Sequence, residues 1–430
     1  MKVGARSTTG WRATISVAMS NYIEAGSIIA IATSLGFWQK AFGIDDLAVG
    51  LLAAFSANAF GAAAGAILGG PLTDRFGRKF IYTWDLLLYM LGVLLAVFAG
   101  SFGMLMLAFV LTGIAVGAGV PASWTYIAEQ APPGGRAKHV GTAQLAWSMG
   151  PVIGFALAAA MAPLGLLGSR IIFAHLFVVA AIVWWIRQGL PESQIWKEER
   201  HVSPAATAAY GKGFGALFSR KPNITALLFL FGVYGFWGIV AGQAGIFMPR
   251  VYAASGVASA VEQDLLQVLL WGCTVLATYF GFMLLADRIS RRVLYVAGAA
   301  LGVLGWVVLV FAPPSLPTLL VFALSWGLSC GVGAQAFYGL WTSELFATPY
   351  RAGAQGVLFF AARVAIGCLS YFFPVLLTQA GVPAVGLLMI GLLLVALVVG
   401  GIWAPNTRGK SLQQIERERY GEVIDPAAVS

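Results

Sequence analysis

Twelve long apolar stretches, separated by short polar connections, run through this sequence from end to end. Crossing the ~30 Å hydrocarbon core of a bilayer takes ~20 residues of α-helix, and most of the stretches reach that length. Backbone groups in lipid must be hydrogen-bonded within the spanning structure, and the strict alternation of a barrel strand is absent from the sequence. We therefore predict an all-α membrane protein with twelve transmembrane helices. The predicted spans are Thr14–Trp38, Ala48–Gly70, Phe80–Gly100, Met104–Ala128, Val140–Pro163, Ile171–Ile186, Asn223–Pro249, Leu265–Ala286, Val293–Ala312, Leu316–Thr342, Ala354–Gln379 and Ala384–Trp403.

Small residues are frequent inside these apolar stretches. The chain has 53 glycines, and runs such as FGAAAGAILGG at residues 60–70 place them among apolar neighbours. Small residues let helix backbones approach closely in a membrane, where association depends on packing. We therefore predict tight helix packing at these runs rather than flexible loops.

The charged residues are distributed unevenly between alternate connections. They make up only 10% of the chain, yet the formal net charge is +9. Most Lys and Arg residues fall on the side that carries both termini, whereas the opposite side has only Lys40, Arg170 and Arg250. By the positive-inside rule, both termini are predicted to be cytoplasmic, in a multi-pass protein of the cytoplasmic (inner) membrane. The positive charge thus indicates orientation, and no nucleic-acid binding is predicted.

An internal repeat divides the chain. The longest polar connection separates the first six predicted spans from the last six. Glu129 and Arg136 after the fourth span recur with the same spacing as Glu344 and Arg351 after the tenth. Repeats of this size are typical of transporters whose halves move about a central site. We predict an N-terminal six-helix bundle at residues 1–190, a cytoplasmic linker at 191–222, a C-terminal six-helix bundle at 223–405 and a cytoplasmic tail at 406–430.

Several connections resemble motifs of a known family. The connection after the second span reads GGPLTDRFGRKF, and its counterpart after the eighth reads LADRISRR. The first resembles, without a gap, the signature G-x-x-x-D-R-x-G-R-[RK] of the major facilitator superfamily. YIAEQAPPGGR, LPES, SELFATPYR and PNTRGKSLQQIE are similar to motifs of its sugar-porter branch, and the similarity covers nearly the whole chain. The resemblance implies two pseudo-symmetric six-helix bundles that transport by alternating access.

The charged connections are candidates for a gate. Arginine can bridge carboxylates bidentately, and an aspartate near a helix N-terminus is favoured by ~0.3–1 kcal/mol. Contacts of this kind between the halves would hold the cytoplasmic side closed and break on opening. The alternative is that these charges only enforce membrane topology. The predicted gating residues are Gly70, Asp74, Arg75, Gly77, Arg78, Glu129, Arg136, Asp287, Arg288, Glu344 and Arg351.

Two ionisable residues stand out within the predicted spans. A charge at the bilayer centre costs ~2.5–3.5 kcal/mol or more, so each is a functional candidate. The resemblance implies a proton-coupling role for Glu24 in the first span, although Phe109 stands where proton-coupled sugar porters have its arginine partner. Arg363 in the eleventh span is predicted to favour an anionic substrate or to hold Glu24 charged in the empty site. The alternatives are a structural hydrogen bond for Glu24 and a snorkelling side chain for Arg363.

Several polar and aromatic side chains are candidate substrate ligands. Gln144 matches the fifth-helix glutamine that binds hydroxyls in sugar porters, and an amide both donates and accepts. The seventh helix departs from the family pattern and keeps only Gln243 as an amide. Rings suited to stacking on a ligand are Tyr22, Trp124, Trp147, Trp237, Tyr338 and Trp341, of which we expect two or three to touch it. Asn58, His175 and Gln335 are predicted to be helix-packing groups instead.

The sequence does not indicate an enzyme. It lacks a Walker-type phosphate loop, its His and Cys residues form no metal-ligand cluster, and no Ser–His pair has a catalytic spacing. We predict a monomeric secondary transporter, without cofactor or metal, that imports a sugar, polyol or acidic sugar derivative by proton symport. Its partners are then a polyhydroxylated small molecule, protons and the lipid bilayer. The alternatives are a proton-coupled antiporter exporting drugs or organic anions, and a sensor that binds sugar without transporting it.

Overall fold

The computed structural model describes residues 5–130, 136–189, 213–257 and 259–421. Within these ranges every regular element is helical, which confirms the all-α prediction. In the described part of the chain, ten helices, taken with their direct continuations, are long and apolar enough to cross a membrane. The prediction of a polytopic membrane protein is thus supported by helix length and composition.

The elements follow one another in two groups. The first group comprises α1 (Ala5–Phe42), α2 (Asp46–Ala54), α3 (Phe60–Phe76), α4 (Arg78–Val97), α5 (Phe102–Gln130), α6 (Arg136–Met161), the 3-10 turn η1 (Ala162–Leu164) and α7 (Leu166–Gln188). The second comprises α10 (Gly213–Ser219), α11 (Lys221–Leu230), η2 (Phe231–Gly235), α12 (Phe236–Ser255), α13 (Ala260–Leu276), η3 (Ala277–Met283), α14 (Arg291–Phe311), α15 (Leu316–Val332), α16 (Ala334–Leu345), α17 (Thr348–Trp403) and α18 (Leu412–Tyr420). The segments η2 and η3 are π-helical continuations of their neighbours.

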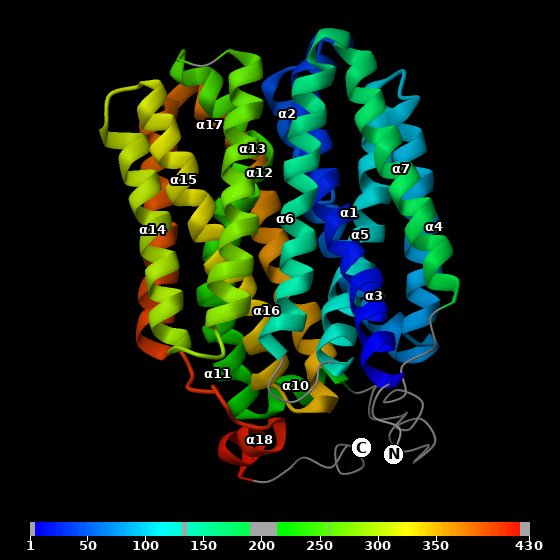
Figure 1. Cartoon of the computed structure of the whole chain (residues 1–430). Helices are drawn as coiled ribbons and strands as arrows, with labels where there is room; N and C mark the ends of the chain where they lie inside the picture. The colour runs from blue at the N-terminus through cyan, green and yellow to red at the C-terminus, as the bar shows by residue number, and fades with distance from the viewer. Residues whose placement is uncertain (1–4, 131–135, 190–212, 258, 422–430) are drawn as a thin grey trace.

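The two groups form two sides of the molecule. Figure 1 shows the first group, in blue to blue-green, beside the second, in green to red, with the long helices running roughly parallel. We call the boundary between the two groups the seam. Helix α1 lies along it because it packs against α6 of its own group and α12 of the other. Helix α17 does the same, since it packs against α12 of its own group and against α2 and α3 of the other. Helices α10 and α18 mark one end of the molecule, called here the α18 end, and α2 marks the opposite α2 end.

The second predicted span, Ala48–Gly70, is broken in its middle. Residues 55–59 separate α2 from α3. Here the Ser56 hydroxyl donates to the carbonyl oxygen of Ala53 (2.7 Å) and accepts from the Asn58 N–H (3.1 Å). A serine that hydrogen-bonds the nearby backbone offers the chain an alternative to the helical ladder. The expectation of one continuous helix is therefore wrong at this point, and the break leaves polar groups at mid-span.

Helix α17 contains the last two predicted spans. Gly381, with φ 75° and ψ 175°, is the non-helical residue inside it. This residue lies between Ala354–Gln379 and Ala384–Trp403, where the sequence predicts a connection. A positive φ favours glycine because a Cβ would crowd the backbone. Gly381 thus divides α17 into two arms that correspond to the two predicted spans.

Helices α3 and α5 pack backbone to backbone. A Cβ placed on Gly65 would lie 2.1 Å from the carbonyl oxygen of Ile114, and one on Gly117 would lie 2.0 Å from that of Ala62. Only residues without a side chain fit at this distance. The structure confirms that the small-residue run in α3 serves close helix packing.

The short helix α18 is docked against the second group of helices. The Tyr420 hydroxyl donates to Asn223 Oδ1 (2.5 Å) on α11. Arg419 donates from Nε to the carbonyl oxygen of Leu345 (3.1 Å) and from Nη2 to that of Pro222 (2.7 Å). The chain after the last span is therefore tied to the ends of α11 and α16.

We predict that Gly65→Ala destabilises the folded protein by about 1–3 kcal/mol, the usual cost of overpacking a tight contact, because the new methyl group forces α3 away from α5. The measurement is the thermal unfolding midpoint in detergent. Gly103→Ala is the matched control, since a Cβ there meets nothing within 4 Å. An unchanged midpoint for Gly65→Ala would contradict this account of the packing.

Candidate functional site

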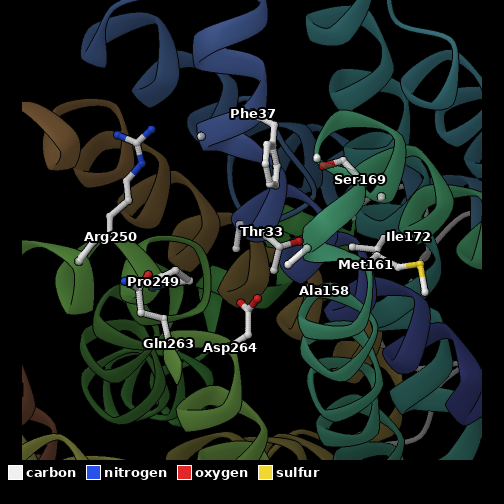
Figure 2. A pocket seen from close by; sticks show the side chains of 16 residues that line it. Thr33, Phe37, Ala158, Met161, Ser169, Ile172, Pro249, Arg250, Gln263 and Asp264 are labelled. Carbon is white, nitrogen blue, oxygen red and sulfur yellow. The ribbon is translucent and has the colours of Figure 1, made fainter. Parts of the chain in front are cut away.

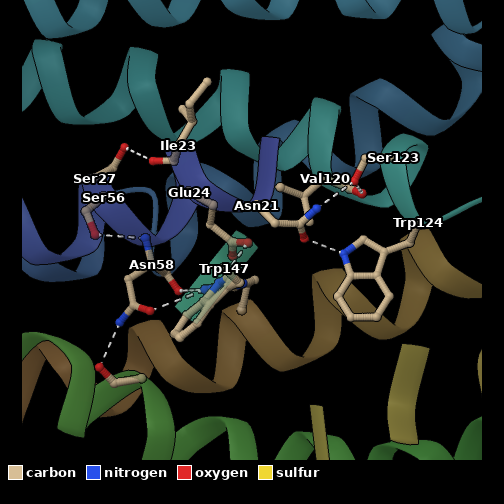
Figure 3. Close-up of polar contacts among 12 residues, drawn as sticks. Asn21, Ile23, Glu24, Ser27, Ser56, Asn58, Val120, Ser123, Trp124 and Trp147 are labelled. Atoms are coloured by element: carbon tan, nitrogen blue, oxygen red, sulfur yellow. Dashed lines mark hydrogen bonds and ion pairs between the residues drawn. The ribbon is translucent and has the colours of Figure 1, made fainter. Parts of the chain in front are cut away.

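A buried ion pair joins the two sides of the molecule at the seam. Glu24 on α1 is 1% exposed and Arg363 on α17 is 5% exposed. A guanidinium nitrogen of Arg363 donates to Glu24 Oε1. Trp147 on α6 donates from Nε1 to Glu24 Oε2 (3.1 Å), a contact seen in Figure 3. The carboxylate thus receives hydrogen bonds from two neighbouring helices.

Arg363 has further partners at the break in the second span. Its Nη1 donates to the backbone oxygen of Asn58 (2.8 Å) and to Asn58 Oδ1 (3.2 Å). The guanidinium also lies over the Phe359 ring, 4.5 Å from its centroid. Removing two charges from water costs several kcal/mol each unless hydrogen bonds satisfy their remaining groups. The freed carbonyl of Asn58 provides such a bond, so the break serves the ion pair.

Asn58 also fixes the position of a third helix. Its Nδ2 donates to the backbone oxygen of Gly242 (3.0 Å) on α12. Figure 3 shows Asn58 beside Glu24 and Trp147. Asn58 is predicted above to be a helix-packing group; the structure gives it that role and contact with the ion pair as well.

The ion pair faces a very small cavity. Its volume is about 10 Å³, room for about one water molecule. Residues of both sides line it, so a ligand of several heavy atoms requires the seam to open. The lining residues are Glu24, Val120, Trp124, Tyr234, Gln335, Tyr338, Gln355, Phe359 and Arg363.

An aromatic cluster surrounds position 109, where the resemblance implies an arginine partner for Glu24. Phe109 is fully buried. Its ring centroid lies 5.4 Å from that of Trp38 and 6.3 Å from that of Phe173. The partner of Glu24 is instead Arg363, which is one of the two roles the sequence predicts for it.

The two candidate glutamines differ in how their amides are satisfied. Gln144 lies on α6 one turn before Trp147, is 1% exposed, and its Oε1 has no hydrogen-bond partner among the described residues. Gln243 on α12 donates to the backbone oxygen of Ile366 (3.2 Å) and accepts from Ser370 Oγ (3.1 Å). Gln144 thus keeps an unused acceptor, whereas Gln243 joins α12 to α17.

Three of the six candidate rings, Tyr22, Trp237 and Trp341, lie in different surroundings. The Tyr22 hydroxyl is 2.9 Å from His175 Nε2 and forms a hydrogen bond with it. Trp237 stacks near Trp326, with 6.4 Å between ring centroids. Trp341 is fully buried among rings of α11, α14 and α16. Of the wider aromatic set, Trp124 and Tyr338 line the cavity and Trp147 reaches Glu24.

Sequence reasoning missed several groups around the cavity. Gln335 is predicted to pack between helices, and Tyr234, Gln355 and Phe359 have no predicted role, yet all four line the cavity. Treating every amide inside an apolar span as a candidate would have found the two glutamines, since an amide in lipid must find a partner. The two aromatic residues give no comparable signal.

The predicted gating acids of the second group bind one arginine. Arg291 donates to Glu344 Oε2 (2.7 Å) and to Asp287 Oδ1 (3.0 Å). Its Nη1 also donates to Thr407 Oγ1 (2.7 Å), while Arg351 donates to a backbone oxygen at the end of α16. These described contacts lie within the second group of helices. Arg291, which sequence analysis does not include in the gate, is the centre of the cluster.

The remaining gating candidates are less informative. Gly77 joins α3 to α4 with φ 92°, a conformation that favours glycine in this tight turn. The side chain of Arg288 is exposed. The side chains of the other candidates lie outside the described part of the chain; these are Gly70, Asp74, Arg75, Arg78, Glu129 and Arg136.

A second polar network crosses the seam at the α2 end. Arg250 on α12 donates to Asp46 Oδ1 (3.3 Å) and to Gln39 Oε1 (2.5 Å), and Thr378 on α17 donates to Asp46 Oδ2 (2.9 Å). Burial raises the pKa of Asp46, but the hydrogen bonds from Gln39 and Thr378 and the charge of Arg250 outweigh it, so the pKa lies below its usual value. A depressed pKa means that the network is intact at neutral pH and weakens only as pH falls through that value.

Long apolar helices in two groups with a buried ion pair between them define a polytopic membrane protein of the transporter type. A family model described as "Major Facilitator Superfamily" matches residues 13–272, and one described as "Sugar (and other) transporter" matches residues 197–418. The "Minor myo-inositol transporter IolF" of Bacillus subtilis (strain 168) is 42% identical over 95% of this chain and 94% of its own length. The chain therefore belongs to the major facilitator superfamily.

More distant relatives and solved structures agree with this assignment. The "Quinate permease" of Emericella nidulans is 25% identical over 96% of this chain and 89% of its own length. The structure of the proton:xylose symporter XylE bound to 6-bromo-6-deoxy-D-glucose aligns with a TM-score of 0.78 at 20% identity, covering 96% of this chain and 99% of that one. The xylose transporter XylE from E. coli in a partially occluded inward open conformation gives 0.72 at 20% identity, over 94% of this chain and 100% of that one. These structures show that the fold is shared.

We predict that Gly339→Val prevents the seam from closing near the α18 end. A Cβ at Gly339 on α16 would lie 1.6 Å from a ring carbon of Trp124 on α5, so any side chain there pushes the two sides apart. The reporter is Gly356→Cys on α17, a buried position where a Cβ lies 3.8 Å from the carbonyl oxygen of Ala66. In a chain whose three native cysteines are replaced, thiol alkylation of this reporter should become about tenfold faster, equivalent to about 1.4 kcal/mol in the opening equilibrium.

Gly353→Ala is the control for this experiment, because a Cβ at that position has nothing within 4 Å. It should leave the alkylation rate unchanged. An equal rate with and without Gly339→Val would show that this contact does not limit closure.

Proposed function

We propose that the chain imports a neutral polyol or sugar, with myo-inositol as the first candidate, by proton symport through alternating access. The support is the extended similarity to a myo-inositol transporter together with the ion pair between Glu24 and Arg363. The ion pair is the observation on which the coupling mechanism rests. The protein would work as a monomer in the cytoplasmic membrane of its cell, with both termini in the cytoplasm.

The proposal includes twelve spans in two six-helix bundles. Ten candidates are present in the described residues; Gly381 divides the longest one, and α2 with α3 supplies one more crossing. The bundles would comprise residues 1–190 and 223–405, with 191–222 as the linker and 406–430 as the tail. In this orientation the α18 end is cytoplasmic and the α2 end is external.

The ion pair couples the proton to the substrate. In the empty carrier Glu24 is ionised and its bond to Arg363 holds α1 to α17, so the seam closes without a ligand. A proton on Glu24 removes that attraction and leaves Arg363 with Asn58 and the Phe359 ring. The protonated seam then closes only when a substrate bridges the two sides. Proton and substrate therefore cross together, and a proton alone does not cross.

The uncharged lining of the cavity favours a neutral substrate. Apart from Glu24 and Arg363, the side chains around it are two amides, four aromatic rings and Val120. Amides donate and accept hydrogen bonds to hydroxyls, and rings pack against the apolar face of a sugar or cyclitol. The unpartnered oxygen of Gln144 gives one further acceptor next to Trp147.

A polyhydroxy acid is the second candidate substrate. Protonation of Glu24 leaves Arg363 with an uncompensated positive charge, which would attract a carboxylate. Relatives named as quinate permeases support this reading. Uptake of myo-inositol and of quinate by reconstituted vesicles, with and without an inward proton gradient, decides between the two. Export of drugs or organic anions would appear as gradient-driven loss of such compounds from the same vesicles.

We predict that Glu24→Gln abolishes gradient-driven accumulation of myo-inositol while leaving exchange between internal and external substrate within about twofold. The glutamine mimics the protonated carboxyl, so the loaded carrier still moves but the empty one does not return. The assay compares net uptake with counterflow in reconstituted vesicles. Glu418→Gln, an exposed tail residue, is the control. Loss of both activities together in folded protein would argue against a coupling role for Glu24.

We predict that Arg363→Gln destabilises the protein by about 3–5 kcal/mol, because it leaves the Glu24 carboxylate buried without a counter-charge. The double variant Glu24→Gln/Arg363→Gln should recover most of the loss, since neither charge then remains. The measurement is the thermal unfolding midpoint of wild type, both single variants and the double variant. Additive losses would show that the two side chains do not depend on each other.

A further inference from the structure

A larger cavity lies in the seam near the α2 end, apart from the ion pair. Its volume is about 230 Å³. Helices α1, α6 and α7 line one side, and α12 and α13 line the other, as Figure 2 shows. Pockets for drug-sized ligands measure ~300–1,000 Å³, so this outer cavity has the size for a smaller ligand. Gly36, one of its lining residues, is exposed.

The outer cavity contains polar groups that lack partners within the described chain. Asp264 on α13 directs its carboxylate into the cavity, toward Thr33 of α1 (Figure 2), and has no hydrogen-bond or ion-pair partner among described residues. Ser169 on α7 is 2% exposed, and its hydroxyl also has no partner in that part of the chain. The Thr33 hydroxyl donates to Ile29 (2.9 Å) and remains free to accept. Ser169 is thus a buried polar group without a partner, and such groups are rare and mark places where a ligand or water binds. Asp264 is partly buried, so its carboxylate is within reach of both solvent and a ligand.

One aromatic ring completes the lining. Phe37 on α1 lies above Thr33, on the same side of the cavity as Ser169 (Figure 2). A ring beside a carboxylate and two hydroxyls is a combination that suits a polyhydroxylated ring, whose hydroxyls point outward while its C–H groups form an apolar face.

We propose that the outer cavity is a second, external binding site for the polyol or sugar, occupied before the substrate reaches the ion pair. The proposal rests on the proposed import function. Asp264 and Ser169 hydrogen-bond substrate hydroxyls from opposite sides of the seam, and Phe37 packs against the ring face. Because the lining belongs to both sides, opening of the seam at this end separates the groups that hold the substrate. The substrate is then free to move on to the ion pair.

Other occupants fit the lining less well. The guanidinium of Arg250 is paired with Asp46, and Asp264 is the one acidic group among the lining residues, so a cation would find a single carboxylate there. A lipid acyl chain would leave the Asp264 carboxylate and the Ser169 hydroxyl desolvated without hydrogen bonds, which is costly. A neutral ligand with several hydroxyls satisfies both groups.

Arg250 connects the outer cavity to the network at the α2 end. The same side chain binds Asp46 and Gln39, the contacts that hold the seam closed there. A ligand next to Arg250 therefore lies where it can compete for those contacts. Binding in the outer cavity and opening of this end are linked through a single side chain.

The test compares uptake with exit of myo-inositol in vesicles of uniform orientation. Asp264→Asn should raise the KM for uptake from the external side about tenfold, as expected for loss of a hydrogen bond to a charged group, while the KM for exit stays within about twofold. Gly36→Leu should act in the same direction by filling the cavity, since a Cβ there meets nothing within 4 Å. It tests the site even where Asp264→Asn impairs folding.

The control is Glu262→Gln, two residues from Asp264. Glu262 forms the capping box of α13 with Ser259, and glutamine preserves that box. This variant removes an exposed carboxylate from the same surface and should leave both KM values unchanged, which separates a local site from general surface charge.

Two negative results have different meanings. If wild type transports myo-inositol but Gly36→Leu and Asp264→Asn leave the KM for uptake unchanged, or shift uptake and exit equally, the outer site is refuted and the proposed function stands. If wild type transports neither myo-inositol nor any other polyol or sugar under any proton gradient, the proposed function itself fails and the outer site with it.

Discussion

The ion pair between Glu24 and Arg363 is the interaction on which the rest of the seam depends. Two charges removed from water are tolerated when hydrogen bonds satisfy most of their remaining groups. The chain supplies these bonds from distant segments: Trp147 binds the carboxylate, and the backbone and side chain of Asn58 bind the guanidinium. Nε of Arg363 has no hydrogen-bond partner among the described residues. The break in the second span is part of the same solution, because an intact helix would keep the Asn58 carbonyl within its own ladder.

Three kinds of contact hold the seam at three levels. At the α2 end, Arg250 and Asp46 are 24% and 31% exposed, so water screens their attraction and the contact is weak. At the centre, the buried charges interact strongly but only while Glu24 is ionised. Near the α18 end, closure depends on shape, since Trp124 fits against Gly339. In the proposed mechanism such a seam opens first at the α2 end, where its contacts cost least to break, while its centre responds to a proton and its α18 end to steric fit.

The sequence predicts the spans well because each span must hydrogen-bond its own backbone groups. Each therefore needs a minimum length and a high mean hydropathy, and both can be read directly from the sequence. It also identifies Glu24 and Arg363 as costly charges and gives their pairing as one of two options. It does not predict the break at Ser56, where a single hydroxyl replaces backbone hydrogen bonds without changing the hydropathy. Nor does it identify Arg291, because arginines that share one connection between helices look alike until the fold decides which one faces Glu344.

The two halves of the broken second span pack most closely on different groups of helices, although both belong to the N-terminal repeat of the sequence. Helix α3 packs backbone to backbone on α5, in the first group, whereas α2 contacts α17 so closely that a Cβ at Gly50 would lie 2.1 Å from the carbonyl oxygen of Tyr371. Thr378 adds a hydrogen bond from α17 to Asp46 at the start of α2. One crossing of the membrane is therefore shared between two bodies, with residues 55–59 as the joint. In the proposed alternating-access motion the surface between the two moving groups passes through the second span, so α2, a short piece of the N-terminal repeat, moves together with the C-terminal group of helices.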